Sequence, residues 1–276
     1  MRPNIRYMDN QGFVRRVSRG VPFYSCRVLE ELSGLRHGFS TRQGGVSAPD
    51  RALNLSRVGW DSPECVDENR RRFFGALQLL PGQVLTLRQI HSDRLHIIKD
   101  TPDHWNRPEG DALATDLTGP VLAVQTADCY PILIADSRTR AVASVHAGWK
   151  GTLARLVRKT VAGMKEAFHC DPADLVVAVG PAIRRCCFEV GAEVVDLFRE
   201  QYPGFPLAVE RVHKPGKYLL DLRAALNVQF EEAGIPFGNI HDLGACTRCR
   251  ADEFFSYRAE GERSGRMMAV IARSCL

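Results

Sequence analysis

Three short apolar runs lie close together near the middle of the chain, and they constrain the fold more than any other stretch. They span residues 121–125, 130–135 and 141–145 and are rich in Val, Ile, Leu and Ala. Runs this short, with many β-branched residues, favour buried strands over helices. The polar residues 136–140 separate the second run from the third and suit a hairpin turn. The second and third runs are therefore expected to pair as antiparallel strands.

This hairpin would bring a thiol and an imidazole to the same open end of a sheet. Counting outward from the turn places Cys129 and Tyr130 opposite His146. Pro131 cannot donate a backbone hydrogen bond, which indicates a break or an edge at this point. Gly148 permits a sharp exit from the strand. A cysteine and a histidine at neighbouring strand ends point to a functional site.

The overall composition is that of an ordinary globular protein, with 45% hydrophobic and 25% charged residues in a chain of 276. No apolar run approaches the ~20 residues that span a bilayer, and the N-terminal stretch lacks the apolar core of a signal peptide. We therefore expect a cytoplasmic protein with no membrane partner, in which most cysteines stay reduced. The formal net charge of +5 is spread along the chain, which favours an anionic small molecule over a nucleic acid as partner.

Helical and strand-like patterns follow one another along the whole chain without a repeat or a linker. Residues 64–80 and 152–168 carry the apolar stripes of amphipathic helices, and Ser62 followed by proline suits the start of the first. We expect a single α+β domain over residues 1–276, with mixed, largely antiparallel sheets layered with helices. Residues 1–20 are expected to be a loosely ordered N-terminal extension.

A glycine-rich segment, TRQGGVS at residues 41–47, is a candidate anion site. Gly44 and Gly45 let backbone N–H groups turn inward beside the guanidinium of Arg42, an arrangement that suits phosphate or carboxylate. The alternative is a tight turn with a surface arginine. Arg42 is therefore a candidate substrate-binding residue.

A second histidine, His91, follows the strand-like run 84–90. With Cys129 and His146 it makes a set of two imidazoles and one thiolate, which leaves a fourth tetrahedral position open, as in catalytic zinc sites. A metal-free dyad, with Cys129 as nucleophile and His146 as base, is the competing interpretation. Copper also binds these groups, but a multicopper oxidase needs more histidines than the eight of this chain are expected to place together. Asp128 is a candidate for orienting a ligand imidazole or for capping the strand end.

The other cysteines predict structural rather than catalytic roles. The chain has nine cysteines, an odd and scattered set that argues against a disulfide framework. Cys246 and Cys249 form a CxxC pair, but a structural zinc site needs four ligands, and the sequence suggests no second pair of this kind. We interpret the CxxC as mainly structural, and the adjacent Cys186 and Cys187 as packing residues at a strand or loop edge.

Several motifs taken together resemble the YfiH/laccase-domain family. They are HGFSTRQGGVS (37–47), ENRRRF (68–73), LRQIHSD (87–93), GDALATD (110–116), TADCYPILIAD (126–136), HAGWKGT (146–152) and GPAIRRCCFEVG (180–191), followed by YLLDLRAALNVQFEEAGI, CTRC and FFSYR. The resemblance covers the chain from about His37 onward. Members of this family are described as polyphenol oxidases, as zinc-dependent purine nucleoside phosphorylases and as peptidoglycan editing factor-like proteins.

The resemblance implies a CNF/YfiH-like fold and a zinc ion bound by His91, Cys129 and His146. It implies phosphorolysis of adenosine, inosine and methylthioadenosine, with adenosine deaminase activity beside it. The expected partners are therefore a purine nucleoside and phosphate. Two alternatives stay open: a copper-dependent polyphenol oxidase, and a metal-free Cys–His hydrolase or deamidase involved in the editing of peptidoglycan precursors.

Overall fold

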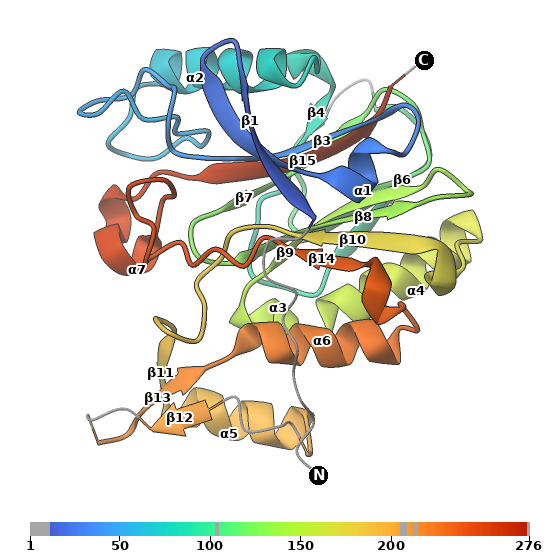
Figure 1. Cartoon of the computed structure of the whole chain (residues 1–276), viewed down its shortest axis with the longest axis vertical. Coiled ribbons are helices and arrows are strands. Elements are labelled where there is room, and N and C mark those ends of the chain that lie inside the picture. The colour runs from blue at the N-terminus through green and yellow to red at the C-terminus, as the bar shows by residue number, and fades with distance from the viewer. Residues whose placement is uncertain (1–11, 103–104, 205–208, 212–214, 275–276) are drawn as a thin grey trace.

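Two six-stranded sheets pack against each other and enclose part of the core (Figure 1). The computed structural model describes residues 12–102, 105–204, 209–211 and 215–274. The first sheet consists, in order, of β1 (Phe13–Ser18), β2 (Val21–Cys26), β3 (Leu35–Ser40), β15 (Met267–Arg273), β7 (Val121–Thr126) and β4 (Val84–Leu85). The second consists of β14 (Ile240–Asp242), β10 (Leu175–Val179), β8 (Tyr130–Asp136), β9 (Val142–Ala147), β6 (Ala112–Thr115) and β5 (Leu95–Ile98). A small third sheet consists of β11 (Glu189–Gly191), β13 (Lys217–Leu220) and β12 (Val209–Arg211).

Helices cover the outer faces of the two large sheets. Figure 1 shows α2 (Pro63–Ala76) over the first sheet, and α3 (Trp149–Leu153), α4 (Leu156–Phe168) and α6 (Leu222–Glu232) over the second. The remaining helices are α1 (Arg27–Glu30), α5 (Ala192–Gln201) and α7 (Tyr257–Glu260). Most neighbouring strands are antiparallel, and the parallel pairs are β4–β7, β5–β6 and β10–β14. The predicted α+β fold with mixed, largely antiparallel sheets is confirmed.

The predicted hairpin of β8 and β9 is present, but its register differs by one residue from the prediction. Asp136 belongs to the strand rather than to the turn, because its N–H donates to the carbonyl of Ala141 at 2.8 Å. Pro131, and not Tyr130, therefore lies opposite His146. The pairing of β8 with β10 ends at Ile132, the residue after Pro131. The predicted break in a strand ladder at the proline is therefore present.

The core explains why β8 is an unbroken apolar run. All of its residues are buried, since the strand is covered on both faces. Leu133 and Ala135 pack with the first sheet, whereas Ile132 and Ile134 pack with the helices on the other side. This alternation is the period of two that a pleated strand imposes.

The helix predictions hold in part. Ser62 caps α2 as expected, since its hydroxyl accepts from the N–H of Cys65 at 3.2 Å. The predicted helix 152–168 is instead two helices, α3 and α4, separated at Arg155, whose φ of 60° is left-handed. The predicted strand 84–90 is also shorter, because only β4 at its start pairs in the sheet.

The N-terminal prediction is wrong for part of its range. Residues 13–18 of the expected extension form β1, an edge strand that pairs antiparallel along its length with β2. Residues 1–11 lie outside the described part of the chain. Besides its pairing with β2, β1 buries Phe13 in the core, and Arg16 and Arg15 bind Glu30 at 2.8 Å and Glu253 at 3.2 Å.

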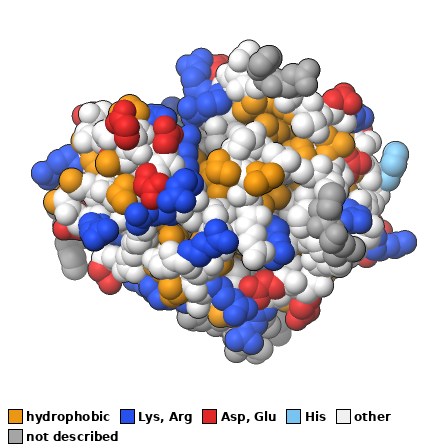
Figure 2. Space-filling view, turned by 90° about the horizontal axis from the view of Figure 1, so that it is seen from above, with side chains coloured by type: hydrophobic (Ala, Val, Ile, Leu, Met, Phe, Trp, Pro, Cys, Tyr) orange, Lys and Arg blue, Asp and Glu red, His pale blue; other side chains and the backbone are white. Residues whose placement is uncertain are grey.

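The surface carries charges of both signs. On the face seen in Figure 2, Lys and Arg side chains are interspersed with acidic and hydrophobic ones and do not form one continuous field. None of the helices in the described part of the chain combines the length and apolarity that a bilayer crossing needs.

Candidate functional site

The structure brings His91, Cys129 and His146 together. Their ligand atoms all lie within 4.8 Å of one another, and Nε2 of His91 is 3.8 Å from Sγ of Cys129. The two imidazole rings stand edge to face, with centroids 5.0 Å apart. These three residues form a group that can hold a metal ion.

The site lies where the chain passes from one large sheet to the other. His91 is in the connection from β4 to β5, and Cys129 is in the short connection from β7 to β8. Both connections have left-handed backbones beside the site, with φ of 59° at His91 and 89° at Asp128. Such conformations are unfavourable for residues other than glycine, so the surrounding contacts must hold them in place.

Asp111 supplies these contacts for the His91 connection, and no sequence pattern identified it as a site residue. Its carboxylate is fully buried and accepts from Nδ1 of His146 at 2.8 Å. It also accepts from the backbone N–H of His91 at 3.1 Å, and from the N–H and hydroxyl of Ser92, both at 2.6 Å. One carboxylate thus orients one candidate ligand through its ring and another through its backbone. The only sequence feature that could have indicated this role is the position of Asp111 directly before the apolar strand β6.

The buried charges of the site stabilise one another. Burial disfavours the ionised forms, but the adjacent His146 imidazolium lowers the pKa of Cys129. Burial likewise opposes the positive form of His146, yet the Cys129 thiolate and the Asp111 carboxylate raise the pKa of His146. The thiolate that a metal or a nucleophilic mechanism requires is therefore favoured here.

The donor set fits a tetrahedral metal ion. Zinc–sulfur and zinc–nitrogen distances of about 2.3 and 2.0–2.1 Å imply ligand atoms about 3.6 Å apart, close to the 3.8 Å between His91 and Cys129. Asp111 holds Nδ1 of His146, which leaves Nε2 for a ligand bond, as in carboxylate–histidine–metal arrangements. Three protein ligands leave one position for substrate or water.

A cavity of about 670 Å³ opens over this group, within the size range of small-molecule sites. Its wall combines basic, aromatic and amide side chains. The lining residues include Arg88, Gln89, Arg107, Gln125, Phe188, Tyr257, Arg258 and Arg266. Gln89 and Gln125 exchange two hydrogen bonds of 2.7 Å, which join the His91 connection to β7.

Asp128 does not orient a ligand imidazole. Its carboxylate accepts from the hydroxyl of Thr247 and from the N–H of Arg258, both at 2.6 Å. It therefore ties the segment that carries Cys129 to two more segments of the cavity wall. Asp111 has the orienting role that was considered for Asp128.

Arg42 lies outside this cavity. Its guanidinium binds Glu260 and the carbonyl of Ala251, both at 2.7 Å, and stacks over Phe255 at 4.6 Å. With Gly44 and Gly45 it lines a separate pocket. The structure thus brings three of the four predicted site residues together and places Arg42 apart from them.

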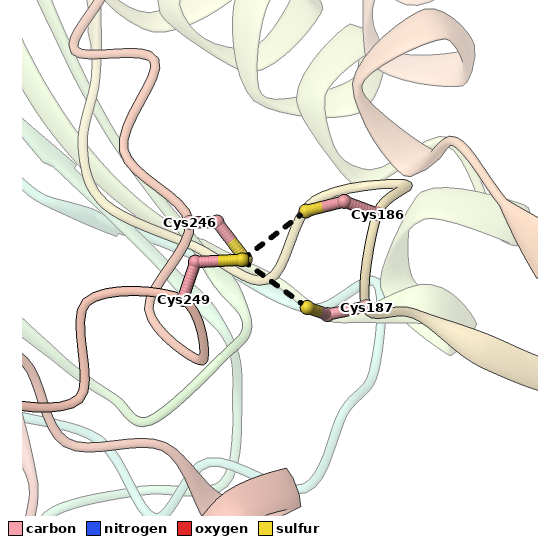
Figure 3. A group of neighbouring side chains, drawn as sticks. All are labelled: Cys186, Cys187, Cys246 and Cys249. Carbon is pink, nitrogen blue, oxygen red and sulfur yellow. Dashed lines mark hydrogen bonds between the residues drawn. The ribbon is translucent and has the colours of Figure 1, made fainter.

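The expectation that the CxxC has no partners is wrong. The interpretation as packing residues holds for Cys187, which is buried in the core, but not for Cys186, which is exposed. The four sulfurs of Cys186, Cys187, Cys246 and Cys249 lie within 4.8 Å of one another (Figure 3). The sequence places the two pairs about sixty residues apart, so only the fold shows that they meet.

Comparisons with known proteins identify relatives that match most of the chain. The family model described as multi-copper polyphenol oxidoreductase laccase matches residues 36–274. The chain is 39% identical over 237 residues to a purine nucleoside phosphorylase of Deinococcus radiodurans, covering 85% of this chain and 88% of that protein. It is 40% identical over 249 residues to adenosine deaminase RL5 of an unknown prokaryotic organism, covering 85% and 93%. The crystal structure of YlmD from Geobacillus stearothermophilus superposes with a TM-score of 0.85 at 34% identity, covering 94% of this chain and 98% of that one.

The residues matched by the family model include the three candidate ligands, Asp111 and the strands of both large sheets except β1 and β2. The motifs and the fold thus lead to the same relatives. The chain belongs to the laccase-domain family, together with YlmD- and YfiH-like proteins.

Proposed function

We propose that this protein is a zinc-dependent purine nucleoside phosphorylase. The observation that carries the proposal is the His91–Cys129–His146 group, anchored on Asp111, in a cavity lined by arginines and aromatic rings. Relatives named purine nucleoside phosphorylase, at 34–39% identity over most of the chain, support the substrate class.

Phosphorolysis sets two demands that the cavity can meet. The bond between C1′ and the purine nitrogen breaks, its electron pair leaves with the base, an oxygen of phosphate bonds to C1′, and the base takes up a proton. The enzyme must therefore hold an anion beside the ribose and accommodate a flat heterocycle. Arg258 and Arg266 supply positive charge, and Phe188 and Tyr257 supply aromatic surface within one cavity.

The roles of the remaining groups follow from their contacts. Zinc, held by the two imidazoles and the thiolate, would supply Lewis-acid charge at this end of the cavity. Asp111 keeps the His146 ring in one orientation and one tautomer. Arg266 is half-buried and close enough to Cys129 for electrostatic interaction, although burial lowers the pKa of its guanidinium. We assign phosphate to the Arg258 and Arg266 side of the cavity; a role for Arg42 stays a prediction.

The decisive experiment is base release. Zinc-loaded protein incubated with inosine and phosphate is expected to release hypoxanthine and ribose 1-phosphate, and Cys129→Ala is expected to release neither. Adenosine is tested in parallel, because the relative named adenosine deaminase predicts release of ammonia from it. Absence of any base release by the zinc-loaded enzyme would refute the proposal.

A metal-free Cys–His hydrolase is the second candidate. The specific observation in its favour is the mutual stabilisation of the Cys129 thiolate and the His146 imidazolium, with Asp111 as a third, orienting group. Metal analysis separates the two: turnover that persists after complete chelation supports the hydrolase, and turnover restored only by zinc supports the phosphorylase. Restoration by copper alone, with oxidation of a phenol, would instead support a polyphenol oxidase.

A further inference from the structure

A second group of soft ligands lies outside the nucleoside site, and nothing in the proposed catalysis uses it. Cys186 and Cys187 lie in the turn after β10, and Cys246 and Cys249 lie in the turn after β14. Because β10 and β14 are neighbouring parallel strands, their carboxyl ends meet at the same edge of the sheet. Figure 3 shows the sulfurs of the two turns pointing toward one another.

Backbone hydrogen bonds hold these two turns side by side. Ala182 and Cys246 form a parallel bridge, in which the N–H of Ala182 donates to the carbonyl of Ala245 at 3.2 Å. The N–H of Thr247 returns to the carbonyl of Ala182 at 3.1 Å. The distance between the two cysteine pairs is therefore set by the fold and does not depend on the sulfurs themselves.

The turn geometry lets two adjacent cysteines face the same point. The N–H groups of Cys187 and Phe188 both donate to the carbonyl of Arg184, at 2.8 and 2.9 Å, which winds residues 184–188 like a turn of helix. Successive side chains then diverge by about 100° rather than by the 180° of a strand. Sγ of Cys249 accordingly lies 3.6 Å from Sγ of Cys186 and 3.4 Å from Sγ of Cys187.

These distances suit one metal ion better than a disulfide. Tetrahedral zinc with four sulfurs at about 2.3 Å has sulfurs about 3.8 Å apart, and the four observed sulfurs all lie within 4.8 Å of one another. A disulfide needs sulfurs about 2.05 Å apart and would leave two thiols unused. Four thiolates this close repel one another strongly, and a divalent cation removes that repulsion.

Hydrogen-bond donors lie beside two of the four sulfurs. The backbone N–H groups of Arg184 and Cys249 are directed at the sulfur of Cys246, and the Arg248 side chain interacts with that of Cys187. Four thiolates and one zinc ion would carry a net charge of −2. The Arg248 side chain lies beside this group, whereas the guanidinium groups of Arg184 and Arg250 bind Asp242 and Glu253. Two backbone donors and the Arg248 side chain thus offset part of the negative charge of the group.

We propose that Cys186, Cys187, Cys246 and Cys249 form a tetrathiolate site for one Zn²⁺ ion, separate from the His91–Cys129–His146 group. On binding, four thiols lose four protons to solvent and the ion gains four sulfur ligands, with no change of oxidation state. The site does not depend on the catalytic activity proposed above.

The position of this site gives it a structural role in the cavity wall. Phe188, next to Cys187, lines the cavity, and Thr247, between Cys246 and Cys249, binds the carboxylate of Asp128. The N–H of Ile183 also donates to the carbonyl of Asp128 at 2.8 Å. Zinc at the four sulfurs would therefore fix the part of the cavity wall that contacts Asp128, next to Cys129, without touching substrate.

The test is metal content of the full-length protein, purified with reductant and zinc. Wild type is expected to hold two zinc ions per chain, C129A/H146A one, and C186S/C249S one. C65S is the matched control, since Cys65 is partly exposed on α2 and belongs to neither group, and it is expected to retain both ions. Cobalt substituted into C129A/H146A is expected to give the sulfur-to-metal charge-transfer absorption of a tetrathiolate site. A C129A/H146A protein without bound metal would overturn the proposal.

A second measurement on C129A/H146A covers the case in which C186S/C249S fails to fold. Alkylation of Cys186 and Cys249, read by peptide mass, is expected to be slow with zinc present and fast after chelation. Cys65 should alkylate equally in both conditions. Equal alkylation of Cys186 and Cys249 with and without chelator, or a peptide mass lower by two hydrogens that shows a disulfide, contradicts the tetrathiolate site.

Discussion

Gly148 is the residue whose substitution most directly tests how tightly the catalytic group is packed. It precedes α3 with φ −78° and ψ 177°, a conformation that alanine adopts without strain. A Cβ added there would lie 2.8 Å from Cδ2 of His91 and 3.1 Å from Sγ of Cys129. Gly148→Ala therefore leaves the backbone unstrained and pushes directly on two candidate zinc ligands.

The expected size of the effect follows from the cost of overpacking. Inserting a methyl group into a filled space costs about 1–3 kcal/mol. His91 belongs to a connection rather than to a strand, so the added methyl group is expected to displace it. The free energy of overpacking then reduces the affinity of the site for zinc. Since ~1.4 kcal/mol corresponds to a factor of ten, the zinc affinity of the catalytic group should fall about 5- to 150-fold.

The assay is competition for zinc against a chromophoric chelator, in a C186S/C249S background so that one site is measured. Gly82→Ala is the control, because its Cβ would meet nothing within 4 Å and its φ is not left-handed. Hypoxanthine release should fall with metal occupancy and recover at high zinc. A G148A zinc affinity equal to that of G82A would refute the close packing described for this site.

Three further outcomes are expected. Asp111→Asn removes the charge that anchors His146 and should weaken metal binding by about 10- to 100-fold, measured in the same competition assay. Arg266→Ala should raise KM for phosphate more than Arg42→Ala, because only Arg266 lines the catalytic cavity; the reverse order would favour the glycine-rich segment as the phosphate site. Burial lowers the pKa of His37 to about 4, so the unfolded chain binds more protons than the folded one between pH ~6.5 and 4, and stability falls as the pH is lowered through this window. The free energy of unfolding should fall by about 3 kcal/mol across this window. Urea unfolding at pH 7 and at pH 4.5 measures this fall. It should be smaller in His37→Gln than in the control His169→Asn, which changes an exposed histidine.

The apolar pattern was sufficient to predict the hairpin of β8 and β9, because strands buried on both faces are apolar throughout. The register required knowing that Asp136 pairs with Ala141, a choice that depends on turn hydrogen bonds rather than on hydropathy. Asp111 was overlooked because its partners, the His146 ring, the Ser92 hydroxyl and backbone N–H groups of the His91 connection, lie about twenty residues or more away in the sequence. The four-cysteine group was misinterpreted for a related reason: its pairs meet only because β10 and β14 are neighbours.

The shared anchor of His91 and His146 has a consequence for metal exchange. Because Asp111 holds both groups through its own hydrogen bonds, the ligands stand ready before any ion arrives. Capture of an ion then requires little ordering of the chain, unlike zinc fingers, which fold only when the metal binds. Removal of this ion should accordingly leave a folded apoprotein, whose melting temperature rises gradually with free zinc according to mass action.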